Sequence, residues 1–212
     1  MGIAERKERE KEQRRNDIID AAETVFNEKG LEKATMDDVA AQAELSKGTL
    51  YLYFKNKDEL HHAIINRGMG ILGNLFIEST KDGENGLHKT KLIGHAFIEF
   101  NIKYPHYYDA FLKHGTMSIC VDDATHTQLE GIPLKQRIMQ HFVEVIMEGI
   151  VDGSISKEIN PQKAAILLWA ELSGVLQLLE YKGSIIENFF NIKHDELLEY
   201  FFEFTQRALR AN

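Results

Sequence analysis

The sequence predicts an all-α protein, with an N-terminal three-helix, helix-turn-helix domain followed by a C-terminal helical effector and dimerisation domain. Apolar residues recur at intervals of three and four along most of the chain, which is the pattern of helices with one buried face. The 212 residues include only three prolines, and no alternating run of Val, Ile and Thr lies between glycine-rich turns. We expect residues 1–57 to form the first domain, 58–81 a connecting helix and 82–212 the second domain.

The composition bounds the class of protein. Apolar content of 43% and charged content of 27% are ordinary for a soluble globular protein. The single cysteine, Cys120, has no partner for an internal disulfide and fits a reducing compartment. No stretch reaches the roughly 18 consecutive apolar residues of a membrane helix, and the charged N-terminus is unlike a signal peptide. These features predict a cytoplasmic protein without a membrane partner.

The first helix is predicted from Arg6 to Lys29. Ile18, Ala22 and Val25 lie on its apolar face, and Gly30 follows as a residue that ends the helix. Its first dozen residues alternate acidic and basic side chains and carry no apolar stripe. They form either a solvated helical extension or an arm that contacts nucleic acid.

The second helix begins after Thr35. Thr35 and Asp38 form a T-x-x-D pattern that resembles a capping box, and the apolar positions Met36, Val39 and Ala40 give this helix a buried face. The pattern therefore predicts a short helix that packs against its neighbours.

A tight turn at Leu45 leads into the third helix, for which Ser46 is the expected cap. Leu50 and Phe54 are four residues apart and are expected to pack inward. The residues left on the outer face are Lys47, Thr49, Tyr51 and Tyr53. The segment 45–57 holds three lysines and no carboxylate. Two short helices joined by a tight turn make a helix-turn-helix, whose second helix enters a major groove of DNA.

With the helix before it, this segment resembles the DNA-binding domain of the tetracycline-repressor (TetR) family of bacterial regulators. The resemblance runs from about Arg14 to Leu60 and is most specific in the phrase SKGTLYLYFKNKDEL. It implies a ligand-responsive repressor that binds a palindromic operator in double-stranded DNA as a homodimer. A helical dimeric adaptor that does not bind DNA is the alternative. The rest of the chain resembles the family only in its architecture.

The resemblance also implies which residues contact DNA. They are Thr35, Ser46, Lys47, Gly48, Thr49, Tyr51, Tyr53 and Lys57. Lys47 and Thr49 begin the recognition helix, where base edges are reached, and Gly48 lets the backbone come close. The phosphate contacts are expected from Thr35, Tyr51, Tyr53 and Lys57. The family often has an aromatic residue where this chain has Leu52, so no contact is implied there.

The charge balance is unusual for a DNA-binding protein. The net charge is −8, and residues 1–60 hold eleven Lys and Arg against fourteen Asp and Glu. Sequence-independent attraction to phosphates is therefore expected to be modest.

The remaining helices follow from caps and apolar spacing. The turn-forming segment KDGENG separates the connecting helix from the second domain, and the segment 116–131 is expected to be irregular. The predicted helices are Asp58–Ser79, Leu87–Lys103, a short one ending near Gly115, Pro133–Val151, Pro161–Lys182 with Gly183 as its end, and His194–Arg210.

A literal G-x-G-x-x-G pattern runs from Gly68 to Gly73. A dinucleotide site would place this pattern after a strand and at the start of a helix, whereas here it falls inside a helical pattern. Close helix packing or a bend explains the glycines better, so an enzyme that binds a nucleotide is a remote alternative and we expect no enzymatic activity.

No metal site or cofactor is expected. His61 and His62 are adjacent and point in different directions on a helix, whereas His95 and Glu99 are four apart and can face one ion. A polar pair facing a cavity or solvent is the commoner arrangement, and no further ligand pattern is present.

The family keeps its effector cavity among the C-terminal helices. The resemblance therefore implies a small apolar or aromatic effector of unknown identity, held by residues among His95, Glu99, Phe100, Tyr107, Phe111, His114, Phe142 and Trp169. The last helix has two apolar stripes, so one side is expected to meet a second subunit. The dimer residues expected there are Leu197, Leu198, Phe201, Phe202 and Thr205.

Overall fold

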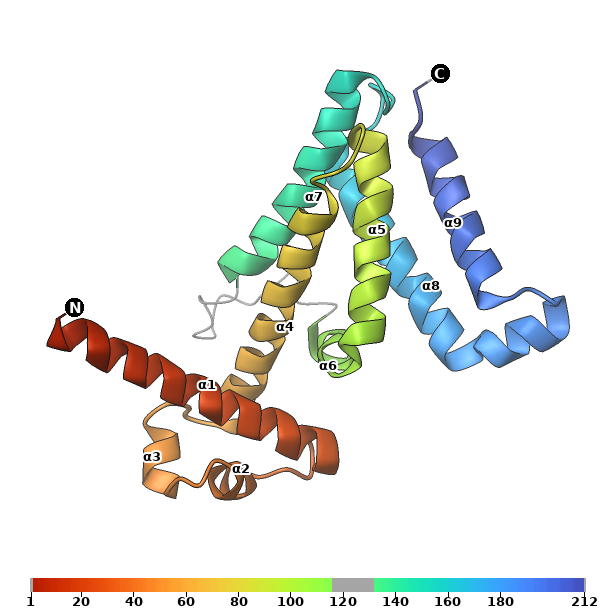
Figure 1. The fold of residues 1–212 in the computed structure, drawn as a ribbon. Coiled ribbons are helices and arrows are strands. Elements are labelled where there is room, and N and C mark those ends of the chain that lie inside the picture. Colours follow the sequence, from red (N-terminus) through yellow and green to blue (C-terminus); the bar gives the residue numbers. More distant parts are fainter. Residues whose placement is uncertain (1, 116–131, 212) are drawn as a thin grey trace. The chain divides into compact units, whose positions relative to one another are not determined.

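A computed structural model describes residues 2–115 and 132–211. For residues 111–115 and 132–135 it describes the backbone alone. Nine α-helices make up nearly all of this part of the chain (Figure 1), which confirms the all-α fold. They are α1 (Ile3–Lys29), α2 (Met36–Gln42), α3 (Lys47–Tyr51), α4 (Lys57–Ser79), α5 (Gly86–Lys103), α6 (Pro105–Gly115), α7 (Ile132–Asp152), α8 (Pro161–Phe190) and α9 (His194–Leu209). The irregular segment expected at 116–131, with Cys120, lies outside the described residues.

The chain divides into two compact units. The first contains the chain up to Met69 together with α6 from His106, and the second contains Gly70–Pro105 and the chain from α7 onward. The boundary therefore falls inside α4 instead of at the KDGENG turn, and α6 belongs with the N-terminal helices. Helix α4 contributes Lys57–Met69 to the first unit and its remaining residues to the second.

The first unit has a continuous apolar core. The core is formed by Ile18, Ile19, Ala21, Ala22, Val25, Ala34, Val39, Ala40, Leu50, Phe54, Leu60, Ala63 and Ile64. The inward residues expected for α1, α2 and α3 are among them, except Met36, which is only partly buried and packs against this core. Burial of Leu50 and Phe54 fixes which side of α3 is left outside, because the two residues hold one side against the core.

The glycines of the G-x-G-x-x-G pattern lie in the middle of α4 and permit close packing. A Cβ atom at Gly68 would come within 2.8 Å of Tyr107 of α6, and one at Gly73 would come within 3.0 Å of Ile138 of α7. Each glycine therefore leaves room for a neighbouring side chain within its own compact unit. This supports the packing interpretation of the pattern.

In the second unit, α5 lies alongside α7, α7 packs on α8, and α9 packs on both α8 and α5 (Figure 1). Helices α5 and α7 approach closely where Gly86 faces Gly149, since a Cβ at Gly86 would collide with the Gly149 backbone. Aromatic residues fill the centre, with Phe97 and Trp169 4.8 Å apart between ring centroids.

Helix α8 is longer than the sequence predicts. It continues through Gly183 to Phe190 and ends at Asn191, which adopts a left-handed conformation with φ of 54°. A side chain at Gly183 would collide with the imidazole of His194. Gly183 therefore lets α9 begin close against α8, and the prediction that it ends the helix was wrong.

Helix α8 is also the one described helix that is long and apolar enough to cross a membrane by length and composition. Its buried residues include Ala165, Leu172 and Leu176. These side chains face the neighbouring helices of the same unit, whereas other apolar residues of α8 are exposed.

Candidate nucleic-acid interface and effector cavity

The N-terminus of α2 is closed by a complete capping box. The Thr35 hydroxyl accepts a hydrogen bond from the Asp38 backbone N–H at 3.2 Å and donates one to Asp38 Oδ2 at 2.8 Å, while the Thr35 N–H donates to the same carboxylate at 3.0 Å. Lys29 adds an ion pair of 2.6 Å to this carboxylate. The hydrogen bond from Lys29, followed by those from Thr35, lowers the pKa of Asp38 to about 2.

Helix α3 is capped by Ser46, whose hydroxyl accepts from the Thr49 N–H at 3.1 Å and lies 2.8 Å from the Thr49 hydroxyl. Gly48 is exposed, and a Cβ atom there would meet nothing closer than 3.9 Å. The protein's own packing does not require a glycine at this position. The missing side chain leaves the backbone open to close approach from outside.

Lys47 is the first residue of α3, and its Nζ forms an exposed ion pair of 2.5 Å with Asp37 Oδ2 of α2. The hydrogen bond and the charge of Asp37 raise the pKa of Lys47. This carboxylate beside the recognition helix is not apparent from the segment 45–57, because it comes from α2. A DNA phosphate or nucleobase that binds Lys47 must therefore displace the Asp37 carboxylate.

Aromatic and apolar side chains complete the outer face of α3. Tyr51 is 49% exposed, whereas Tyr53 is partly buried against the core of the unit. Leu52 is 83% exposed. An exposed leucine next to a recognition helix is suited to contact a thymine methyl group, because that group is the apolar feature of the major groove.

Lys57 has a different environment from the one expected. Its Nζ donates hydrogen bonds to the backbone carbonyls of Leu31, Glu32 and Ala34, at 2.6, 3.2 and 3.0 Å. These contacts engage all three ammonium protons and hold the loop between α1 and α2. A phosphate contact by Lys57 stays a prediction, and in this structure Lys57 connects the start of α4 to that loop.

A polar cluster joins α1, α4 and α6 in the first unit. Arg67 pairs with Asp20 and Glu23, at 2.5 and 3.1 Å, and the Tyr107 hydroxyl donates to Glu23 at 2.7 Å. Burial, followed by the hydrogen bond to Glu23, raises the pKa of Tyr107 to about 12. Tyr107 thus lies in the unit that carries the helix-turn-helix. It does not line the cavity described next.

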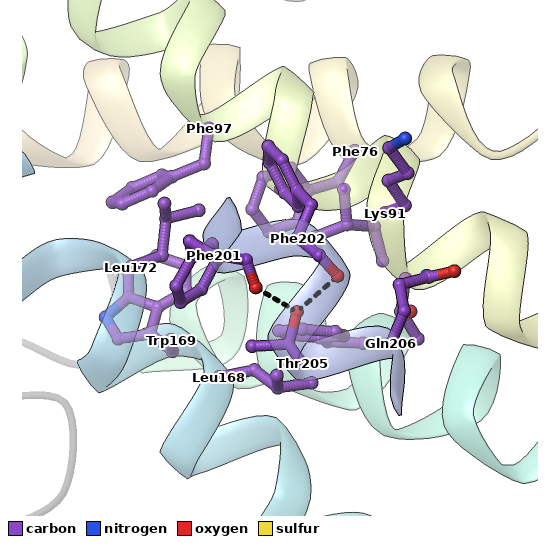
Figure 2. A pocket seen from close by; sticks show the side chains of 14 residues that line it. Phe76, Lys91, Phe97, Leu168, Trp169, Leu172, Phe201, Phe202, Thr205 and Gln206 are labelled. Carbon is purple, nitrogen blue, oxygen red and sulfur yellow. Dashed lines mark hydrogen bonds between the residues drawn. The ribbon is translucent and has the colours of Figure 1, made fainter. Parts of the chain in front are cut away.

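The second unit contains a mostly apolar cavity of about 30 Å³ (Figure 2). Of the residues expected at an effector, Phe142 and Trp169 line it. Side chains that the sequence analysis did not assign to an effector also line it, namely Phe76, Thr90, Lys91, Ile93, Gly94, Phe97, Leu168, Leu172, Phe201, Phe202, Thr205 and Gln206.

The other expected effector residues are elsewhere. His95 borders a separate groove, and Glu99 pairs with Lys103 at 2.6 Å. Phe100 is buried next to Tyr104. Phe111 and His114 lie on α6, and their side chains are outside the described ones. The described residues contain no cluster of three or more metal-ligating side chains.

The residues expected at a dimer interface divide into two groups. Phe202 and Thr205 are buried within their own unit, where they line the cavity, as does the partly buried Phe201. Leu197 and Leu198 are also only partly exposed. A role for these residues in a dimer stays a prediction.

An apolar stripe is exposed on α8 of the second unit. Its members are Leu167, Leu178, Tyr181, Ile185 and Phe189, between 47% and 83% exposed, and the last four recur every three or four residues. Gly174 lies in the same register, and a Cβ there would meet nothing within 4 Å. On α9, Tyr200 and Phe204 are each 60% exposed. Sequence periodicity alone did not separate these residues from the buried ones.

Comparison with known proteins agrees with this geometry. Residues 18–64 match the family described as bacterial regulatory proteins, tetR family. The fatty acid metabolism regulator protein of Bacillus subtilis is 32% identical over 162 residues, which span 73% of this chain and 77% of that protein. The transcriptional repressor KstR2 of Rhodococcus jostii is 26% identical over 71% of this chain and 72% of its own length. The regulator YfiR of Bacillus subtilis matches over only 28% of this chain and 29% of its own length, at 42% identity.

Solved structures share the fold over nearly the whole chain. FadR of Bacillus subtilis in complex with stearoyl-CoA has a TM-score of 0.64 at 19% identity, covering 92% of this chain and 98% of that one. A Rhodococcus protein of unknown function reaches 0.74 at 15% identity, covering 93% and 95%. The helix-turn-helix and these likenesses define a DNA-binding transcriptional regulator. The chain belongs to the TetR family.

Proposed function

We propose that this regulator is a repressor that binds a palindromic operator as a homodimer and leaves it when a small molecule enters the second unit. Its site of action is the cytoplasm, where the operator DNA lies. The single observation that supports the dimer best is the exposed apolar stripe of α8, defined by Leu167, Leu178, Tyr181, Ile185 and Phe189.

A stripe of this kind favours a second copy of the chain. The spacing of three and four residues from Leu178 to Phe189 matches the seam of two helices that pack along their length, and Gly174 leaves room for close approach. Tyr200 and Phe204 of α9 extend the apolar surface. Monomeric soluble proteins rarely expose large continuous apolar patches, so exposed apolar side chains in register on one helix favour a partner surface.

Sedimentation tests the dimer. The protein is expected to sediment as a dimer at micromolar concentration, and Ile185→Glu is expected to convert it into a folded monomer. Glu187→Lys is the matched control, because Glu187 is exposed on the same helix outside the stripe. A monomeric wild-type protein overturns the proposal.

The operator follows from two recognition helices related by twofold symmetry. Helix α3 of each subunit is proposed to enter a major groove, with half-sites about one helical turn, ~34 Å, apart. Lys47 and Thr49 are proposed to read bases, while Tyr51 and Tyr53 hold phosphates. Duplexes selected from a random library are expected to show dyad symmetry. Lys47→Ala or Thr49→Val is expected to relax base preference, costing about 1–3 kcal/mol for a good base contact.

The effector is proposed to be a largely apolar small molecule that binds in the cavity lined by Phe97, Phe142 and Trp169. The likeness to a FadR structure that holds stearoyl-CoA supports this class of ligand. At about 30 Å³ the cavity is about a tenth or less of the volume of a typical ligand pocket, roughly 300–1,000 Å³. An effector must therefore displace side chains, and it lowers operator affinity only if it binds the two states unequally.

A further inference from the structure

A groove of about 520 Å³, lined by both polar and apolar side chains, lies between α5 and α9, next to the apolar cavity. Its lining includes the cations Lys91 and Arg210 and the imidazoles of His88 and His95, against the single carboxylate of Glu84. Burial, followed by the charge of Lys91, lowers the pKa of His95, so the positive charge of the groove comes from Lys91 and Arg210. Lys91 and Gln206 line both the groove and the cavity, so the two spaces adjoin at these side chains.

Phe202 lies at the junction of the two spaces, since it lines the cavity and contacts residues that line the groove. Its ring centroid lies 4.3 Å from that of His95, and Lys91 Nζ lies 6.0 Å from it. Figure 2 shows Phe202 between the aromatic side chains, with Phe97 and Trp169, and the polar end, with Lys91 and Gln206. A Cβ atom at Gly94 would come within 2.5 Å of the Phe202 ring, so Gly94 provides the space that the ring occupies.

The basic side chains at this junction are available to an anion. Among the described residues, other lysines of α5 pair with carboxylates, Lys89 with Glu148 and Lys103 with Glu99, whereas Lys91 and Arg210 form no ion pair there. Gln206 Nε2 donates to the Leu87 carbonyl at 2.8 Å.

We propose that the effector is an anionic amphipath, whose head group binds in this groove against Lys91 and Arg210 and whose apolar chain enters the cavity when the Phe202 ring swings out. This inference rests on the proposed effector response and adds the chemical class of the ligand and the site of its head. A carboxylate or a phosphate on the ligand provides the charge, and the apolar chain of the ligand packs against the apolar side chains around Trp169. Rotation of Phe202 joins the two spaces into one site with a charged end and an apolar end.

The chain contains one tryptophan, Trp169, which lines the cavity and reports on its contents. Trp169 fluorescence is to be titrated with dodecanoate, dodecanoyl-CoA and methyl dodecanoate. We expect the two anions to change the emission, and the neutral ester to bind about tenfold or more weakly, as for the loss of a hydrogen bond to a charged group. Binding of dodecanoate identifies a carboxylate head, and binding of the thioester alone identifies a phosphate.

Variants separate the groove from general apolar binding. Lys91→Gln is expected to weaken binding of the anions about tenfold and to leave the affinity for the ester unchanged. Lys91→Arg is expected to restore the affinity for the anions. Lys103→Gln on the same helix is the matched control. Phe202→Leu is expected to keep the fold and speed ligand uptake. Equal affinity for ester and carboxylate, or equal losses in Lys91→Gln and Lys103→Gln, overturns the inference.

Operator binding measured with the same ligands distinguishes the two proposals. If dodecanoate binds and the operator affinity does not change, the anionic site stands and the effector response fails. If a neutral aromatic compound releases DNA while neither anion perturbs Trp169, the effector response stands and this site fails.

Discussion

Asp37 holds Lys47 in an ion pair of 2.5 Å at the start of the recognition helix. The pair is exposed, with 57% of the Asp37 side chain and 65% of the Lys47 side chain accessible, so it contributes little to stability. Its effect is expected on DNA binding instead, because the carboxylate competes with DNA for the Lys47 ammonium and, wherever it lies near the duplex, repels the phosphate backbone.

Asp37→Asn is therefore expected to tighten binding to duplexes of every sequence. The dependence of affinity on salt should steepen, because about one further phosphate is then neutralised. Fluorescence anisotropy with a random duplex between 50 and 200 mM salt, roughly the range over which such contacts are resolved, measures both quantities. Glu158→Gln, an exposed change in the second unit, should leave both unaltered. An unchanged affinity in Asp37→Asn would show that the carboxylate lies away from DNA.

Lys57→Met is expected to destabilise the protein by about 1 kcal/mol or more, because three backbone carbonyls lose a charged donor. Lys55→Met is the matched control at an exposed lysine two residues away. Urea unfolding of both variants decides between a structural role and a phosphate contact. A stable Lys57→Met protein with a reduced salt dependence of DNA binding would favour the phosphate contact.

Glu44 occupies the turn of the helix-turn-helix with φ of 54°. This left-handed conformation is unfavourable for a side chain other than glycine, so Glu44→Gly is expected to stabilise the protein by up to about 1 kcal/mol. Asn191→Gly, at another left-handed position, should stabilise the protein less, because asparagine tolerates this conformation. Thermal unfolding of the two variants compares them directly. A lower melting temperature for Glu44→Gly contradicts the expectation.

The pKa of Asp38, lowered to about 2, predicts how its contribution depends on pH. A carboxyl with a lowered folded-state pKa stabilises the fold above its ordinary value near 3.8 and loses this effect as the pH falls toward 2. The difference in stability between the wild type and Asp38→Asn should therefore be constant from pH 7 to about 5 and shrink below it. Urea unfolding at a series of pH values tests this, and a difference that grows with acidity is the contrary result.

Gly183→Ala is expected to cost about 1–3 kcal/mol, because the added methyl group collides with His194 and overpacks the junction of α8 and α9. Lys182→Ala, next to it and exposed, is the control. If Gly183→Ala is as stable as the control, the close approach of α9 to α8 at this point is wrong.

The sequence predicted the parts of the fold that depend on local rules. The caps at Thr35 and Ser46 and the inward face of Leu50 and Phe54 follow from spacing within one or two turns, and all are present. The continuation of α8 past Gly183 depends on a residue from the next helix, which local propensity does not contain.

The candidate sites show the same limit. The second apolar stripe of α9 was apparent in the sequence, yet Phe202 and Phe204 differ from one another only in what packs against them. Phe202 fills space left by Gly94, and Phe204 is 60% exposed. The carbonyl partners of Lys57 are more than 20 residues away in the chain. No spacing rule connects them.

The open surroundings of Gly48 have a genetic consequence. A methyl group there meets no atom of the folded subunit within van der Waals contact except at 3.9 Å, so Gly48→Ala subunits should fold and assemble as the wild type does. In a cell that carries both alleles, the proposed dimers would then combine one wild-type recognition helix with one that the added methyl group keeps from approaching the DNA. The variant is expected to be dominant over the wild-type copy, and derepression in such a merodiploid strain would reveal it without any purification.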